Sequence, residues 1–175
     1  MFAKWLGALL VLAAAAAWGE RQAIRLRRRV VELEEFRLAL RLLMAEIGYT
    51  ATPLPRALEY VASRLKGSGV RSFFTEVRIQ LAEPGLVDDA STAWSRVAAV
   101  KQETLALEAD DWAVLTRVAA GLGALGRDDQ VRQLELADAQ LSSLATEATE
   151  VCRRGEKMWR YLGVFGGLAI VILLL

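Results

Sequence analysis

The chain has 175 residues, of which 54% are hydrophobic, and a formal net charge of +1. Its mean hydropathy of +0.28 is high for a freely soluble domain of this length. It contains no histidine and a single cysteine, Cys152. These counts exclude a disulfide framework within the chain and a structural zinc site, because such sites need cysteine pairs or several nitrogen and sulfur ligands.

Charge is distributed unevenly along the sequence. Residues 20–30 contain five arginines and one glutamate, and a second, weaker basic stretch covers residues 153–158 and Arg160. Residues 31–152 contain 12 basic and 19 acidic side chains, a net charge of −7. Since a nucleic-acid-binding domain needs a basic face on its folded body, we expect no nucleic-acid partner.

Two apolar segments occupy the ends of the chain, at residues 1–19 and 159–175. Each contains a run of 17 residues that is apolar except for one basic residue, Lys4 or Arg160. Such a run would measure about 26 Å as a helix, slightly less than the bilayer hydrocarbon core of about 30 Å. Aromatic residues stand at the borders of both runs, where their rings prefer the membrane interface. We therefore predict one transmembrane helix at each end, with the lipid bilayer as a partner.

The two basic stretches predict the orientation of these helices. By the positive-inside rule, residues 20–30 and 153–158 form cytoplasmic necks, which places the domain of residues 31–152 in the cytoplasm as well. The first segment also fits a cleavable signal peptide, because small residues occupy positions 13–17. The arginines that follow it favour a retained anchor instead.

Three glycines in the second segment, Gly163, Gly166 and Gly167, are candidates for helix packing in the membrane. Gly163 and Gly167 have the G-x-x-x-G spacing that lets two helix backbones approach closely, although glycine is also common in membrane helices without that role. Cys152, beside the second neck, is interpreted as a small structural residue. An intermolecular disulfide or a reactive thiol is the alternative.

Between the necks, apolar residues recur every three or four positions, which predicts helices and almost no strand. Thr52 and Pro53 have the pattern of an N-cap followed by proline at the first helical position. The Pro84-Gly85 pair ends the third helix, and Asp88 or Asp89 would cap the fourth. The predicted stripes are Leu33, Phe36, Leu40, Leu43 and Ile47; Leu54, Leu58, Val61 and Leu65; Val70, Phe73, Phe74, Val77 and Leu81; Ala90, Ala93, Trp94 and Val97; Trp112, Leu115, Ala119 and Leu122; and Leu134, Ala137, Leu141, Leu144, Ala148 and Val151.

Six amphipathic helices cannot bury their apolar stripes separately. We therefore predict an all-α protein whose cytoplasmic domain is a six-helix bundle, flanked by an N-terminal and a C-terminal transmembrane helix. The first and last helices of the bundle are expected to continue into the membrane.

Three acidic doublets, Asp88-Asp89, Asp110-Asp111 and Asp128-Asp129, stand where helices are predicted to begin. N-capping and the helix dipole explain such aspartates without catalysis. The sequence has no phosphate-binding glycine loop, nucleophile elbow or cysteine–histidine pair, so we predict no enzyme activity, cofactor or metal site. Asp128, Asp129 and Gln130, at the start of the longest helix, are the candidate partner-binding residues.

Motifs along nearly the whole chain resemble those of the stage III sporulation protein AB family of endospore-forming bacteria. They are Ala51-Thr52-Pro53-Leu54 followed by Ala57-Leu58-Glu59, then Ala93-Trp94, Leu122-Gly123 and Asp129-Gln130, and the ending Glu156-Lys157-Met158-Trp159-Arg160-Tyr161-Leu162-Gly163-Val164-Phe165-Gly166-Gly167. The ending is the most specific element. The chain departs from the family pattern at Gly126, where an aspartate is usual, and at Val118-Ala119, where Phe-Gly is common.

The resemblance implies a structural component of the channel-like complex between mother cell and forespore, seated in the cell membrane on the mother-cell side. The family is similar to the inner-membrane platform proteins of type II secretion and type IV pilus machines, whose cytoplasmic domains are six-helix bundles. The implied partners are the sporulation ATPase, stage III sporulation protein AA, and other membrane subunits of the channel. The residues alone leave open a membrane-tethered helical scaffold or signalling adaptor.

Overall fold

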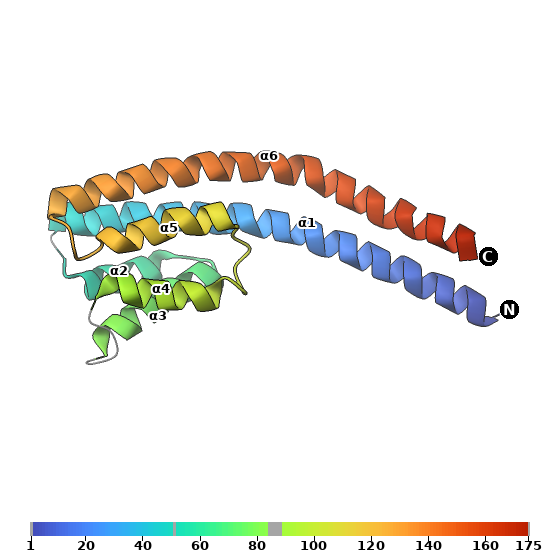
Figure 1. Ribbon diagram of the computed structural model, residues 1–175, viewed down its shortest axis with the longest axis horizontal. Coiled ribbons are helices and arrows are strands. Elements are labelled where there is room, and N and C mark those ends of the chain that lie inside the picture. Colours follow the sequence, from blue (N-terminus) through green and yellow to red (C-terminus); the bar gives the residue numbers. More distant parts are fainter. Residues whose placement is uncertain (1, 51, 84–88, 175) are drawn as a thin grey trace. The chain divides into compact units, whose positions relative to one another are not determined.

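The computed structural model describes the backbone of residues 2–50, 52–83 and 89–174, and the side chains of residue 14 and of residues 17–50, 52–83 and 89–155. The described backbone contains six α-helices and one short π-helix, and no strand (Figure 1). The prediction of an all-α chain with six helices is confirmed. The chain divides into two compact units, one of residues 31–146 and one of residues 1–30 with 147–175.

The helices follow one another in a simple order. They are α1 (Phe2–Ala45), the π-helix η1 (Glu46–Thr50), α2 (Leu54–Arg64), α3 (Ser68–Ala82), α4 (Ala90–Lys101), α5 (Ala109–Gly121) and α6 (Arg127–Leu174). The backbone is helical throughout both predicted necks, so the first and last helices continue beyond the unit of residues 31–146. Their continuation into a membrane stays a prediction.

The unit of residues 1–30 and 147–175 contains the two predicted transmembrane segments. Most of their side chains are not described, and the packing of Gly163, Gly166 and Gly167 is not described either. Among the residues whose side chains the structure describes, no helix combines sufficient length and apolarity to cross a bilayer. The two spans and the glycine packing therefore stay predictions.

The core of the unit of residues 31–146 is built around aromatic rings from four helices. Phe36 of α1 contacts Phe73 of α3 edge to face, with ring centroids 5.4 Å apart, and Phe73 contacts Trp94 of α4 in the same way at 4.9 Å. Trp112 of α5 completes the cluster. Such edge-to-face pairs stabilise a core beyond the burial of their area. All five residues of the first predicted stripe are buried, four in α1 and Ile47 in η1.

The buried face of α6 follows the predicted stripe at Leu134, Ala137, Leu141 and Ala148. The prediction is wrong at Val151, which is 44% exposed, and Leu144 is only half-buried. The reason is a step of four residues from Leu141 to Ala145, which is 2% exposed. A period of 3.6 residues allows a step of three or four at each turn, and sequence alone does not choose between them.

Two carboxylates of α1 accept hydrogen bonds from backbone N–H groups in the turns between other helices. Glu32, only 8% exposed, accepts a hydrogen bond from the Ala106 backbone N–H at 2.6 Å, and Glu35 accepts one from the Gly67 N–H. A Cβ at position 67 would collide with the Glu35 carboxyl group, so a larger residue there would displace this carboxylate from its hydrogen bond. The α2–α3 and α4–α5 turns therefore lie at the same end of the unit, near residues 32–35.

A polar group ties α3 to α4. The Lys101 ammonium donates to Glu76 at 2.6 Å and to Ser72 at 2.9 Å, and Ser72 also donates to Glu76. Partial burial raises the pKa of the Glu76 carboxyl, but the hydrogen bonds from Lys101 and Ser72 and the Lys101 charge outweigh burial and lower it below the ordinary value. These bonds fix the relative rotation of the two helices.

Substitutions of Trp94 test the aromatic core. Trp94→Ala should lower the free energy of unfolding by about 3–5 kcal/mol, because the cavity cannot collapse fully. Trp94→Phe should cost clearly less, since its ring still packs on Phe73 and Phe74 and the buried indole N–H, which has no partner among the described residues, is removed. Thermal and denaturant unfolding of the full chain in detergent, with the exposed Val100→Ala of α4 as control, would measure both. Equal losses for Phe and Ala would contradict this account.

Candidate partner-binding surface

The η1–α2 and α5–α6 connections meet at the end of the 31–146 unit opposite the turns near residues 32–35. The Arg127 guanidinium donates to the Gly48 carbonyl, which places the start of α6 beside the end of α1 (Figure 1). Gly123 has a φ of 79° in the α5–α6 connection, a left-handed conformation that favours glycine. We call the surface of residues 46–50, 52–55 and 121–130 the η1 end.

Three depressions open at or beside the η1 end. The largest, of about 500 Å³, lies between α1 and α6, and we call it the α1–α6 groove. Its apolar lining includes Met44, Ala45 and Val131, and its charged lining is Arg41, Asp128, Arg132 and Glu135. The other two, of about 290 and 380 Å³, share Leu54 and Gly123. Concave surfaces of this kind suit a protein partner's side chains or a small ligand.

The structure brings all three candidate residues, Asp128, Asp129 and Gln130, to the η1 end. Asp128 lines the α1–α6 groove, Gln130 lines the smallest depression and donates to the Leu125 carbonyl at 2.7 Å, and Asp129 is exposed beside them. The N-cap interpretation of the two aspartates is wrong, because α6 begins at Arg127 and both lie within its first turn. There they still interact favourably with the helix dipole.

The other acidic doublets behave differently from one another. Asp89 is the N-cap of α4 as predicted, accepting from the Thr92 N–H at 2.7 Å, while Asp88 lies outside the described residues. The Asp110-Asp111 prediction is wrong in position, because Glu108 is the N-cap of α5. Asp111 completes the capping box by accepting from the Glu108 N–H at 2.8 Å. Across the described residues, no group of three acidic or cysteine side chains is arranged to hold a metal ion.

A polar network shapes the chain between α1 and α2. Thr50 Oγ1 donates to the Glu46 carbonyl at 2.6 Å, and Thr52 Oγ1 donates to the Glu46 carboxylate at 2.8 Å. The sequence predicted Thr52 as the N-cap of α2, and this prediction is wrong. Pro53 takes that position, and α2 begins at Leu54. Sequence reasoning missed the network because the π-helical turn brings Thr52 back toward Glu46.

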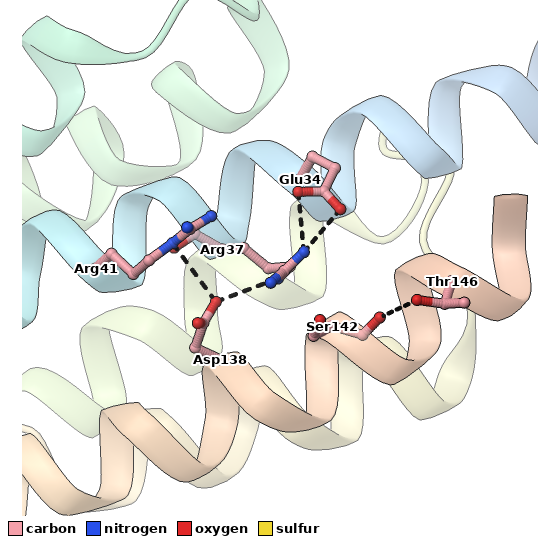
Figure 2. Close-up of polar contacts among 6 residues, drawn as sticks. All are labelled: Glu34, Arg37, Arg41, Asp138, Ser142 and Thr146. Carbon is pink, nitrogen blue, oxygen red and sulfur yellow. Dashed lines mark hydrogen bonds and ion pairs between the residues drawn. The ribbon is translucent and has the colours of Figure 1, made fainter.

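An ion-pair cluster joins α1 to α6 beneath the groove, and sequence reasoning did not find it. Arg37 Nε lies 3.2 Å and Arg41 Nε 3.8 Å from the same Asp138 oxygen, and Arg37 also contacts Glu34 at 2.8 Å. Figure 2 shows the Asp138 carboxylate of α6 directed at both arginines of α1. Arg37 and Asp138 are about four-fifths buried, so their pair is less screened by solvent than the Glu34 contact. The sequence separation of 101 residues hides this pairing from local pattern analysis.

The Asp89 cap generates a pH prediction. Hydrogen bonds from the Thr92 backbone N–H and hydroxyl hold the pKa of the Asp89 carboxyl below its ordinary value. Because the folded pKa is depressed, this stabilisation is present above about pH 4 and is lost as the pH falls through the folded pKa. Asparagine caps a helix about equally well without a charge. The melting temperature of the full chain should therefore fall less between about pH 5 and 3 in Asp89→Asn than in the unvaried chain, and parallel curves would contradict the cap's contribution.

Comparisons with known proteins agree with this architecture. The family model for stage III sporulation protein AB matches residues 4–175. Stage III sporulation protein AB of Bacillus subtilis (strain 168) is 31% identical over 172 residues, which cover 98% of this chain and 99% of that protein. A solved structure of a stage III sporulation protein AB is similar with a TM-score of 0.66 and 29% identity, over 72% of this chain and 97% of the solved chain. The chain therefore belongs to the stage III sporulation protein AB family.

Proposed function

We propose that the chain is a non-catalytic platform of the sporulation channel complex, to which a cytoplasmic ATPase and other membrane subunits of the channel bind. Segments 1–19 and 159–175 anchor it in the cell membrane on the mother-cell side, and residues 31–152 are cytoplasmic. The ATPase is of the stage III sporulation protein AA type. Family membership supports the role in sporulation, and the names of the relatives describe no enzyme.

One observation carries the proposal. The helices that enter the two apolar chain ends, α1 and α6, are the same helices whose other ends form the η1 end and the α1–α6 groove. The Arg37–Asp138 pair ties these two helices together within the unit of residues 31–146. A partner that binds the η1 end therefore contacts both elements that lead to the proposed anchors. Such a geometry suits a protein that transmits the force of an ATPase to its membrane anchors or that anchors the ATPase itself.

A membrane-tethered scaffold or signalling adaptor is the alternative, and the bound partner distinguishes the two. A platform binds the ATPase directly, whereas an adaptor would bind other proteins at the same surface. Binding of the purified full chain in detergent to a purified ATPase of the stage III sporulation protein AA type therefore tests the proposal. Absence of direct binding, with both proteins folded, would remove the coupling role.

Accessibility of an introduced cysteine tests the topology. In a Cys152→Ser background, Glu103→Cys, on the connection after α4, should react with a membrane-impermeant maleimide only after the cells are made permeable. Alkaline phosphatase fused after Leu175 should be active, since the second span leads out of the cytoplasm. A fusion active only as a cytoplasmic reporter, or a mature N-terminus generated after Ala17, would contradict the two-anchor arrangement.

A matched pair of charge reversals tests the partner surface. Asp128 and Asp110 are both exposed, occupy the second position of their helices and carry acidic neighbours. Each aspartate→lysine change should therefore lower stability similarly, by about 1 kcal/mol or less. Only Asp128→Lys should weaken ATPase binding, by about tenfold, because Asp110 lies at the opposite end of the unit. Melting curves and binding isotherms of both variants separate a stability effect from an interface effect, and equal affinities would exclude Asp128 from the contact.

A further inference from the structure

Tyr49 is the most exposed large apolar side chain among the described residues. It is 89% exposed. Tyr60 of α2, by comparison, is 37% exposed and lies against the Arg64 guanidinium. Exposing an aromatic ring to water costs hydrophobic free energy that burial would recover. Large, rigid aromatic rings of this kind are frequent anchors of protein interfaces.

Hydrogen bonds restrain the turn that presents Tyr49. Tyr49 belongs to η1. In and just after η1, the hydroxyls of Thr50 and Thr52 both donate to Glu46, and the two hydroxyls also bond to each other at 2.7 Å. Thr52 N–H also donates to the Glu46 carbonyl at 3.1 Å. Because these hydrogen bonds restrain the turn without a partner, binding at Tyr49 should cost less ordering entropy than binding at an unrestrained loop. The ring is thus presented in advance at the rim of the α1–α6 groove, which it also lines.

The charges around the groove indicate the chemistry of its occupant. Three exposed carboxylates, Asp128, Asp129 and Glu135, form no ion pair within the described residues, and Arg132 is the one guanidinium of the groove without such a pair there. The other guanidinium of the groove, that of Arg41, already pairs with Asp138. The Arg127 guanidinium, also at the start of α6, binds the Gly48 carbonyl and forms no ion pair within the described residues. The three carboxylates and the guanidiniums of Arg127 and Arg132 leave an acidic excess of one charge beside an apolar lining, which favours a basic and amphipathic partner over an acidic one.

We propose that the α1–α6 groove binds an amphipathic basic helix of the ATPase partner, with Tyr49 as the anchor of that contact; this inference rests on the function proposed above. Asp128 and Glu135 are seven residues apart on α6, about 10.5 Å along the helix axis. A helix lying along α6 meets both carboxylates with two arginines or lysines about seven residues apart. The apolar residue between them covers Met44 and Val131, and Tyr49 packs on its flank.

Binding of the full chain to the purified ATPase, measured by biolayer interferometry in one detergent, tests the inference. Tyr49→Ala should weaken binding about 30-fold or more, and Tyr49→Phe less than about threefold, because the ring and not the hydroxyl makes the contact. Tyr60→Ala is the matched control, an exposed tyrosine outside the groove, and should change affinity less than about twofold. All three variants should keep the melting temperature of the unvaried chain within a few degrees.

A second pair of variants tests the charge of the occupant. Glu135→Lys should weaken binding about tenfold and reduce its dependence on salt, since it removes a carboxylate that attracts the basic helix. Glu59→Lys, an exposed position within α2, is the control and should leave both quantities unchanged. A gain in affinity for Glu135→Lys would overturn the proposal of a basic occupant.

The remaining outcomes separate this inference from the proposed function. If the unvaried chain binds the ATPase and Tyr49→Ala binds as tightly as Tyr60→Ala, the groove inference is overturned and the proposed function stands. If the unvaried chain does not bind, both are overturned. If light scattering without the ATPase shows that the chain self-associates and that Tyr49→Ala abolishes this, the occupant is a second copy of the chain, which also overturns the proposal.

Discussion

Burial of one face of α1 is the constraint on which the 31–146 unit depends. Phe36 on this face is fully buried and contacts the rings of Phe73, Phe74 and Trp112. Beside it, Glu32 satisfies a backbone N–H in the turn before α5, and Arg37 pairs with Asp138 of α6. One helix therefore supplies the apolar centre, the acceptors for distant turns and the charge that positions the last helix.

Much of this fold could be predicted from sequence, for a local reason. The helical period of 3.6 residues shows in the apolar stripes, and the buried stripe of α1 and the Asp89 cap of α4 follow from residues close together in the chain. The failures involve choices that sequence leaves open. Thr52 has the chemistry of an N-cap, yet a π-helical turn brings its hydroxyl to Glu46 instead. At α5, Glu108 takes the cap and the more typical Asp110 and Asp111 fall into the first turn.

The candidate site was likewise predictable from sequence only in part. The position of Asp128, Asp129 and Gln130 at the start of α6 was predictable, because helix starts carry recognisable acidic residues. Their neighbourhood was not, since it requires Gly48 of η1 to meet Arg127 across the unit. The exposure of Tyr49 was equally hidden, because an aromatic residue just beyond an apolar stripe is more often part of the core. Only the direction of the η1 turn sends it to the surface.

The pairing of α1 with α6 has a consequence for biosynthesis. Arg37 and Asp138 are 101 residues apart in the chain, so the two helices can close the unit only when its last helix has left the ribosome. At synthesis rates of about 5–20 residues per second, the apolar face of α1 waits about 5–20 s for that partner. During this interval α2 to α5 provide the only cover that the nascent chain itself can offer, and the rings of Phe73, Phe74 and Trp112 are the groups that shield Phe36 from other chains.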